Sequence, residues 1–302
     1  MSRATKFIGF EHGAVKRQWK RLTQWDRVKA IRVREQLSAK TLAPFSRAHE
    51  TRRLLLCESP PVIATEQKFV MVWSPKSACS TAMIWFFQVI GVADKARAFD
   101  NFPHLYRIRV HYPSAYHRNA LRTDISDFHI LRIIRDPYQR AVSSYRHALR
   151  DGFENRRLSA FLGRPVTKKT GCTFDEFLAY LATIDIEKAN PHIAQQRHPI
   201  EAQRPPTFTV NVSEENLLSR LNAFEETASL PRTDFRKVPW IEQLEHGRKA
   251  GQAGYDDDVG KIKFSREEAR PGGAWPSAVA FLTHKRRDII AQIYRTDIDH
   301  YL

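Results

Sequence analysis

The sequence predicts an α/β fold in which helices cover both faces of a mostly parallel sheet. Two observations support this prediction. Short, fully apolar runs such as residues 69–73 are typical of strands buried on both sides, and segments of helical period separate these runs. Strands that alternate with helices along the chain imply a parallel sheet with helices on each face.

Three segments supply the first part of the expected sheet. Residues 68–73 are expected to form a buried strand. Residues 106–113 alternate between apolar and polar side chains until Pro113, so they are also expected to form a strand. Residues 128–135 form a third apolar strand that runs into a turn.

Helices are expected directly after these turns. One helix covers residues 80–90 and ends near Gly91, and another covers residues 138–149, right after an Asp-Pro turn. Thr173 as N-cap, with Glu176 in the capping-box position, predicts the start of a third helix.

The rest of the chain continues this alternation. Residues 206–226 are expected to form a short strand and a helix, and residues 278–302 a helical C-terminus with a tail. Two segments, residues 151–172 and 245–275, are basic or Gly-rich and are expected to be loops, as lids or substrate-binding segments.

The chain of 302 residues carries a formal charge of +16, from 49 Lys and Arg against 33 Asp and Glu. A field of this sign attracts nucleic acid, anionic polysaccharide, acidic lipid surfaces and phosphorylated cofactors. Charge alone does not choose among these partners, and a solvated basic surface is the simplest alternative. No helix-turn-helix, RNA-recognition signature or zinc finger is visible, so nucleic acid is not the expected partner.

The domain organisation follows from the charge distribution. Residues 1–60 are expected to form a basic helical arm, packed on the body or bound to a partner, and residues 61–302 a single domain. With no apolar signal core and no run long enough to cross a bilayer, the protein is expected to be soluble and cytoplasmic. Three widely spaced cysteines, Cys57, Cys79 and Cys172, fit a reducing compartment and predict neither a disulfide framework nor a zinc site. The oligomeric state is left open.

The first candidate site is the stretch SPKSACSTAM, which starts at Ser74 after the first apolar strand. Hydroxyl side chains at Ser77, Ser80 and Thr81 mark a helix start, whose backbone N–H groups and dipole favour an anion. Lys76 adds a positive charge at the turn. A Walker-type phosphate loop places its lysine after glycines, whereas this loop has no glycine and an early lysine, which disfavours ATP binding of that type. An ordinary turn with an exposed lysine is the alternative.

The second candidate site follows the strand of residues 128–135. Arg135 ends this strand, and Ser143 lies eight residues further on, in the next helix. The helix brings the serine hydroxyl back beside the strand end, where one phosphate would meet both an arginine fork and a serine donor. Alternatively, Arg135 pairs with Asp136 and Ser143 lies on the helix surface.

Two histidines are candidates for a general base. His111 lies near the end of the segment expected to be a strand, and ligands of parallel α/β sheets gather at the carboxyl ends of strands. A histidine in this position is able to accept a proton near neutral pH. His104 is the second candidate, and most of the twelve histidines are expected to be structural or exposed.

Together these stretches resemble the sulfotransferase superfamily, whose members use 3′-phosphoadenosine 5′-phosphosulfate (PAPS). Residues 75–81 are similar to the PKxACT form of the family's 5′-phosphosulfate loop, and Arg135 with Ser143 matches its Arg-x7-Ser motif for the 3′-phosphate. The PKxACT form is typical of the carbohydrate, or family 2-like, branch. The resemblance covers about residues 65–302 and implies a three-layer fold similar to that of the P-loop NTPases.

Weaker similarities to the same branch lie downstream. TFDEFLAYL is similar to its TFxEFLxYL helix, NPHIAQQ to its NxHWxPQ segment, VNVSEENLLSRL to its strand-then-ExL element, and IYRTDIDHYL to its Tyr-x-x-Asp-x-x-x-Tyr terminus. The chain departs from the pattern at Ser80, which replaces a threonine, and at Ile193 and Ala194, which replace a tryptophan and a proline beside His192. The branch usually has an N-terminal membrane anchor, which this sequence lacks, so a soluble, bacterial-type enzyme is expected.

The resemblance implies a role for each candidate residue. His111 would be the base, with His104 as the alternative, and Lys76 would stabilise the bridging oxygen as negative charge develops on it. Arg135 and Ser143 would hold the 3′-phosphate and so distinguish PAPS from ATP. The 5′-phosphosulfate would bind to Pro75, Lys76, Ser77, Ala78, Cys79, Ser80 and Thr81, and the acceptor would contact His104, Arg109 and His192. No metal is expected, because the cations and N–H dipoles of the protein carry the charge.

The acceptor is expected to be a carbohydrate or another molecule with a hydroxyl group. The positive charge favours an anionic polysaccharide, which Arg107, Arg109, Arg118 and the basic stretch of residues 150–169 would contact. A small-molecule or lipid-linked acceptor is left open. Two other interpretations also stay open: a nucleotide-dependent kinase, and a polyanion-binding module that depends on neither Lys76 nor His111.

Overall fold

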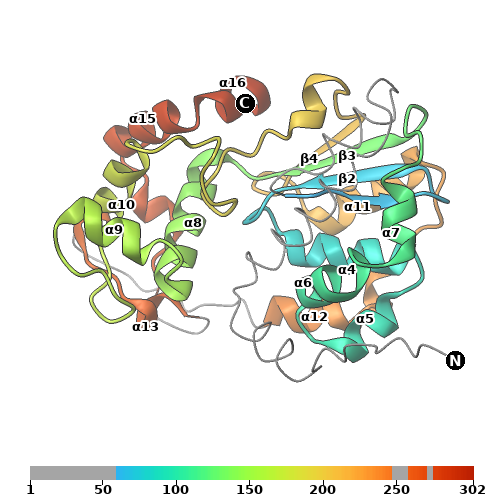
Figure 1. Cartoon of the computed structure of the whole chain (residues 1–302), viewed down its shortest axis with the longest axis horizontal. Coiled ribbons are helices and arrows are strands. Elements are labelled where there is room, and N and C mark those ends of the chain that lie inside the picture. Colours follow the sequence, from blue (N-terminus) through green and yellow to red (C-terminus); the bar gives the residue numbers. More distant parts are fainter. Residues whose placement is uncertain (1–58, 247–257, 271–274) are drawn as a thin grey trace, which may run out of the picture.

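A computed structural model of the chain describes residues 59–246, 258–270 and 275–302. Within this part the α/β prediction is confirmed, because four strands form one mostly parallel sheet with helices on both faces (Figure 1). Residues 1–58 of the predicted basic arm 1–60, and residues 247–257 and 271–274 of the predicted loop 245–275, lie outside the described residues. None of the helices in the described part has the length and apolarity to cross a bilayer.

The sheet has the strand order β1-β2-β3-β4 and is parallel except at one edge. β2 pairs in parallel with β3, and β3 with β4, whereas β1 runs antiparallel to β2. The strands are β1 Val62–Ala64, β2 Phe69–Trp73, β3 His129–Ile134 and β4 Phe208–Asn211. Because the parallel strands end at one edge of the sheet, the loops that follow them gather there.

Alternating strand residues fill two cores, one on each face of the sheet. Phe69, Met71 and Trp73 pack against the helices on one face, and Val70 and Val72 pack against the helix and loops on the other. The first face is covered by α4 (Cys79–Val89), α5 (Ala93–Phe99), α11 (Leu217–Thr227) and α12 (Pro239–His246), and the second by α7 (Ala115–Ala120). These layers give the three-layer arrangement that the sequence predicted.

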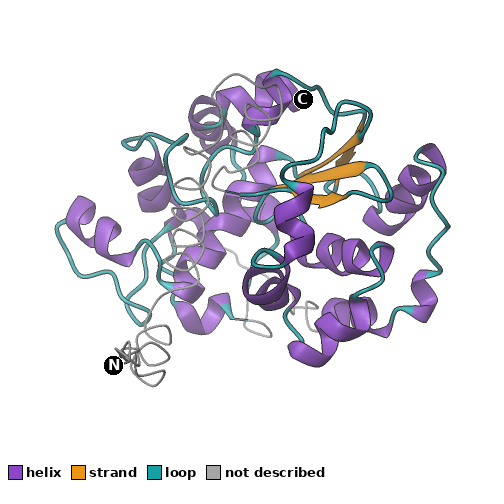
Figure 2. Ribbon diagram, turned by 45° about the vertical axis from the view of Figure 1, so that its right-hand side comes forward, coloured by secondary structure: helices purple, strands orange, loops and turns teal. Residues whose placement is uncertain are grey.

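A separate group of helices surrounds a third core, on the left of Figure 1. Tyr145 is fully buried in this core, and its hydroxyl donates to the Cys172 carbonyl at 2.6 Å. The group consists of α8 (Pro137–Asp151), α9 (Asn155–Leu162), α10 (Phe174–Leu181), α13 (Arg266–Ala269), α14 (Ala278–Phe281) and α15 (His284–Ile293), followed by α16 (Arg295–Tyr301). The turned view in Figure 2 shows how small the sheet is beside these helices. α8 connects the two parts, because it begins at the end of β3 and reaches into the helical group.

Most predicted elements are confirmed with small shifts at their ends. The helix predicted at residues 80–90 is α4, which ends before Gly91, a residue with φ of 70°. Thr173 and Glu176 form the expected capping box at the start of α10. The segment 151–172, predicted as a loop, contains α9.

The strand predicted at residues 106–113 is wrong, because this segment is helical. α6 (Pro103–Tyr106) leads into a π-helical turn at Arg107–His111. The buried side chains include His104, Arg107, Ile108, His111 and Tyr112, which have the 3–4 spacing of a helix. The alternation of this segment fits a strand, but the helical period fits the same residues.

Candidate active site

The loop after β2 contains two non-glycine residues whose backbone angles are usually adopted by glycine. Lys76 and Ala78 both have left-handed backbone angles, with φ of 73° and 52°. A non-glycine residue adopts such angles at a cost of about 1–3 kcal/mol, and such outliers gather at functional sites. Alternation of left-handed and right-handed residues turns successive N–H groups toward one concavity, the arrangement that binds anions in many phosphate sites. The loop therefore has a conformation suited to an anion.

The helix that follows this loop begins without a side-chain cap. Its N-cap residue is Ala78, which provides no side-chain cap. The first N–H groups of a helix have no partner within the helix and favour an anion, and the helix dipole adds a partial positive charge. Ser80 and Thr81 line the cavity in this first turn.

Lys76 lies half-buried in the same loop, close to other positive charges. Burial, followed by the positive charges of Arg150 and Arg135, lowers the pKa of Lys76 from 10.5 to about 7. Neighbouring like charges repel one another, and a bound anion between them removes this repulsion. The site is therefore suited to a group that carries several negative charges.

The junction after β3 presents side chains rather than backbone. Arg135 directly follows β3, and its Nη1 donates to the Lys76 carbonyl at 3.2 Å. The helix start is closed here, because Asp136 accepts from the Gln139 N–H at 2.8 Å and caps α8. Ser143 lies further along α8 and lines the same cavity as Arg135 and Lys76. The structure thus brings the two predicted motifs together.

Gln196 joins these two junctions. Its Oε1 accepts from the Ser77 hydroxyl at 3.0 Å and from the Arg135 N–H at 2.9 Å, and its Nε2 donates to the Arg135 carbonyl at 2.8 Å. Its own backbone N–H donates to the Asp297 carboxylate at 2.8 Å. The buried side-chain amide of Gln196 therefore fixes the loop after β2 against the end of β3. Asp297 of α16 holds the backbone of Gln196 in place.

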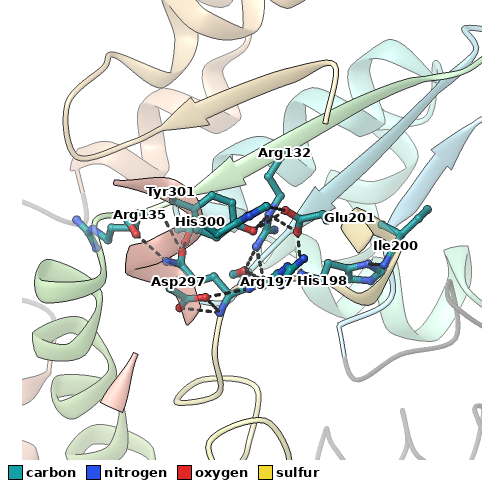
Figure 3. A network of polar contacts seen from close by, with 12 residues as sticks. Arg132, Arg135, Arg197, His198, Ile200, Glu201, Asp297, His300 and Tyr301 are labelled. Carbon is teal, nitrogen blue, oxygen red and sulfur yellow. Dashed lines mark hydrogen bonds and ion pairs between the residues drawn. The ribbon is translucent and has the colours of Figure 1, made fainter. Parts of the chain in front are cut away.

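A buried ion pair extends this network beneath the edge of the sheet (Figure 3). Arg132 Nε lies 3.0 Å from Glu201 Oε1, and both side chains are fully buried. Tyr301 bridges the pair, accepting from Arg132 Nε at 3.1 Å and donating to Glu201 at 2.6 Å. Arg132 Nη2 also donates to Ser74 Oγ at 2.9 Å. Loss of one partner of a buried pair typically costs about 3–5 kcal/mol, so this network fixes one arrangement of the chain below the loop.

Arg140 supports the loop through three backbone carbonyls. Its nitrogens donate to Pro75 at 3.1 Å, to Ala194 at 2.7 Å and to Pro191 at 3.2 Å. The side chain is 1% exposed and does not line the cavity. Arg140 therefore holds the segment 191–194 against the loop and is not a ligand-binding arginine.

The two junctions open into one cavity of about 1330 Å³. Pockets for a single drug-sized ligand have volumes of about 300–1,000 Å³, so this cavity has room for a nucleotide and part of a second molecule. Both βα junctions and two histidine-bearing walls line it.

The first histidine-bearing wall carries His104, in α6. His104 Nε2 lies 3.2 Å from the Ser80 hydroxyl at the start of α4. The imidazole stacks on the Trp73 indole with 5.7 Å between ring centroids, and the Arg107 guanidinium lies 4.2 Å from the centre of the same indole. This wall therefore places an imidazole and a cation next to the anion-binding loop.

The second histidine-bearing wall is formed by one face of α8 and the segment around His192. The side chains that α8 presents at helical spacing are Ser143, Arg146, His147 and Arg150. His147 contacts His192 with 4.1 Å between ring centroids, and its Nδ1 lies 2.9 Å from Asp151. Burial lowers the pKa of His147 to about 4, and it also lowers that of His192. Both imidazoles are therefore neutral at neutral pH.

Most of the predicted site residues line the cavity. They are Pro75, Lys76, Ala78, Cys79, Ser80, Thr81, Arg135 and Ser143 of the predicted nucleotide site, and His104 and His192 of the predicted acceptor site. Ser77 is fully buried, with its hydroxyl on Gln196, and Arg109 is exposed outside the cavity lining. The side chain of Ser77 thus supports the loop from behind.

His111, the predicted base, lies outside the cavity lining. It is 4% exposed, and its ring packs 5.5 Å from that of Phe86 and 5.9 Å from that of Phe87. Burial, followed by the charges of His117 and Arg107, lowers its pKa to about 3. This position follows from the helical conformation of the segment, which directs His111 into the core and leaves His104, the second candidate, at the cavity.

Sequence reasoning missed the residues that hold the site together. Gln196 lies in the NPHIAQQ stretch, but nothing in that stretch reveals that its amide joins two distant loops. Arg140 looked like one more residue of a helix with several arginines. Arg107, by contrast, was expected from the sequence to contact an anionic polysaccharide, and it does line the cavity.

Comparison with known proteins adds one finding. A family model with the description Sulfotransferase family matches residues 60–301. No curated protein and no solved structure matches the chain. The matched range contains the whole sheet, both βα junctions and the network of Figure 3. The match favours sulfuryl transfer over the kinase and polyanion-binding alternatives.

Proposed function

This chain belongs to the sulfotransferase family, and we propose that it transfers a sulfuryl group from PAPS to a hydroxyl group of an anionic carbohydrate. The family identifies a PAPS-dependent sulfotransferase, whereas the acceptor, the base and the donor-binding residues are our proposals. The observation that carries these proposals is the single cavity that Lys76, Arg135 and His104 all line.

The donor is proposed to bind across the two βα junctions. The N–H groups at the start of α4, together with Lys76, hold the 5′-phosphosulfate, and Arg135 with Ser143 holds the 3′-phosphate. The uncapped helix start and the left-handed loop support the first assignment. The second is supported by Arg135 and Ser143 lining the same cavity, because a guanidinium and a hydroxyl together suit a phosphate. Lys76, protonated once an anion is bound, offsets the charge that develops on the bridging oxygen.

His104 is proposed as the general base. Its Nε2 faces Ser80 at the helix start, where the sulfuryl group would lie, and it is therefore within reach of an incoming hydroxyl. The acceptor oxygen bonds to sulfur, and its proton passes to His104 Nε2. The bond between sulfur and the bridging oxygen breaks, and adenosine 3′,5′-bisphosphate leaves with the bonding electrons. A positioned base of this kind contributes about 10²–10⁴-fold to the rate.

The cavity walls support a carbohydrate acceptor. Phe102 and Phe153 line the cavity, and Phe102 is 43% exposed, so both offer apolar ring surface to a sugar. The net charge of +16 favours an acceptor that is itself anionic. A small-molecule or lipid-linked acceptor is the alternative.

Transfer of labelled sulfate from PAPS tests the acceptor assignment. The panel contains uronic-acid polysaccharides, neutral polysaccharides, small alcohols and lipid-linked sugars. We expect label on the acidic polysaccharides. Label found only on small alcohols or lipid-linked sugars would refute the carbohydrate assignment while leaving sulfuryl transfer intact.

Substitution of the histidines by glutamine tests the base. We expect His104→Gln to lower kcat by at least 10²-fold with unchanged affinity for adenosine 3′,5′-bisphosphate. His284→Gln, at an exposed position outside the cavity lining, serves as the matched variant and should retain the turnover. A loss of turnover in His111→Gln or His192→Gln, with bisphosphate affinity intact and His104→Gln fully active, would move the base to that residue.

A further inference from the structure

We infer that Arg107 is the anion-binding residue of the acceptor subsite, and that the acceptor carries an acidic group close to the hydroxyl that receives the sulfate. This inference rests on the proposed function, because it requires the acceptor to enter beside His104. It specifies the acceptor further, from a molecule that is anionic overall to one with a carboxylate or sulfate on the reacting sugar or its neighbour.

Arg107 is a buried cation without a counter-charge in the described part of the chain. It is 4% exposed, yet no carboxylate among the described residues forms an ion pair with it, and its Nε and Nη1 have no hydrogen-bond acceptor. Arginine is always charged in proteins, and an uncompensated buried charge costs several kcal/mol. Burial accordingly lowers the pKa of Arg107. A ligand that carries an anion would remove this cost.

The other deeply buried arginines are compensated. Arg132 pairs with Glu201, and Arg140 binds three carbonyls, as described above. Arg286 pairs with Asp175 at 2.6 Å and with Asp258 at 2.7 Å, and the hydrogen bond to Asp175 is the main reason that its pKa is raised. These arginines have structural partners, whereas Arg107 has the face of an indole. The difference indicates that no described residue is the partner of Arg107, and a bound anion would fill that role.

The position of Arg107 places such a partner in the cavity. Arg107, Trp73 and His104 all line it. The guanidinium lies 4.2 Å from the centre of the Trp73 indole on which His104 also stacks. An acidic group held by Arg107 therefore lies close to the proposed base, which suits a substituent on the same sugar as the reacting hydroxyl or on the adjacent one.

The donor has its own cations. The positive charges that act most strongly on Lys76 are those of Arg150 and Arg135, and the uncapped start of α4 adds N–H groups. These groups are assigned to the anionic parts of PAPS, which leaves Arg107 for the acceptor. The acceptor is therefore the expected source of the anion that Arg107 binds. If the donor supplied this anion instead, substitution of Arg107 would lower the affinity for the donor product.

The test uses two acceptors that differ only in charge: an oligosaccharide with uronic acids, and the same oligosaccharide after reduction of its carboxyl groups to alcohols. Arg107→Gln is expected to lower kcat/KM for the acidic acceptor by about 10–100-fold, the loss typical of a charge-assisted hydrogen bond. The reduced acceptor should lose less than threefold, and the affinity for adenosine 3′,5′-bisphosphate should not change. Arg122→Gln, the same change at an exposed position outside the cavity, should leave all three values unchanged.

Each outcome has a distinct meaning. Equal losses on the two acceptors would overturn the inference, and so would a parallel loss of bisphosphate affinity, which would assign Arg107 to the donor. If the native chain transferred sulfate to neither oligosaccharide, binding of the acidic form to the bisphosphate-saturated protein would be measured by calorimetry. Binding that Arg107→Gln abolishes would support the subsite even though the proposed reaction failed, and binding that it leaves unchanged would overturn the subsite.

Thermal stability gives a second test, because a ligand-binding role and a structural role of Arg107 predict opposite changes of Tm. Without ligand, Arg107→Met should leave Tm unchanged or raise it, because it removes an uncompensated charge while keeping similar volume. Arg286→Met, which leaves Asp175 and Asp258 without their partner, should lower Tm. A marked fall of Tm in Arg107→Met would indicate that Arg107 stabilises the fold, against the inference.

Discussion

The two βα junctions of the cavity differ in how they meet an anion. The junction after β2 uses its backbone: Lys76 and Ala78 are left-handed, and α4 begins without a cap. The junction after β3 has a regular start, capped by Asp136, and presents the side chains of Arg135 and Ser143. Both follow parallel strands at one edge of the sheet, so the same topology supports two kinds of anion site.

Because of this difference, side-chain substitutions at the two junctions remove different functions. A backbone site keeps its N–H groups when a side chain is truncated, so loss of Lys76 leaves most of the binding and removes the positive charge needed in the transition state. A side-chain site loses its contact outright when the arginine is truncated. The comparison therefore predicts that the first junction controls kcat and the second controls affinity.

The largest effect is expected from Lys76→Ala. Removal of one group that stabilises developing charge typically lowers kcat by about 10²–10³-fold. The affinity for adenosine 3′,5′-bisphosphate should fall less than tenfold, because the N–H groups of α4 remain. Steady-state kinetics and calorimetry check the two numbers. A loss of affinity that matches or exceeds the loss of kcat would break the comparison.

Arg135→Ala is expected to act mainly on binding. A hydrogen bond to a charged group contributes about 1.5–3 kcal/mol, so the affinity for adenosine 3′,5′-bisphosphate should fall by about 10–100-fold. Affinity for adenosine 5′-monophosphate, which lacks the 3′-phosphate, should stay the same, and it serves as the control ligand. Equal losses for both nucleotides would mean that Arg135 does not recognise the 3′-phosphate.

The affinity for adenosine 3′,5′-bisphosphate is expected to depend on pH, with an effect of intermediate size. Burial lowers the pKa of Lys76 to about 7 in the free site, so Lys76 is neutral above this pH. A bound anion favours the protonated form and raises that pKa, so binding above pH 7 takes up a proton. Affinity should therefore fall as pH rises from about 7.5 to 9, by at most about tenfold per unit. Lys76→Arg, which keeps its charge, should give a flat profile, and a slope that persists in this variant would assign the proton to another group.

Gln196→Ala is expected to have the smallest effect and tests whether the two junctions are coupled. Because its amide holds Ser77 of one junction and the backbone of Arg135 in the other, its loss should weaken both functions together. We expect kcat and bisphosphate affinity each to fall about threefold to tenfold, as for the loss of about 1 kcal/mol of hydrogen bonding. Gln195→Ala, the adjacent residue outside this network, is the control. A change confined to one of the two parameters would show that Gln196 does not couple the junctions.

The sequence predicted the two junctions because their information is local. The spacing of Arg135 and Ser143 and the order of residues 75–81 are properties of short segments, and helix geometry then fixes where those side chains lie. The prediction at residues 106–113 failed for the same reason. Five alternating residues fit both a strand and a helix, and only packing of the buried stripe from His104 to Tyr112 on the rest of the core distinguishes them. The base candidate changed with it, from His111 to His104.

The sequence by itself determined the α/β class, the strand and helix that flank each anion site, and the family to which the chain belongs. Only the tertiary structure decided which side chains complete the site. Gln196 lies 119 residues from Ser77, and Asp297 lies 101 residues from Gln196, yet hydrogen bonds connect them. Likewise, nothing in the neighbourhood of Arg107 along the chain reveals that it is buried with no counter-charge among the described residues. Contacts of this kind depend on desolvation and on distances between segments far apart in sequence, which no local pattern encodes.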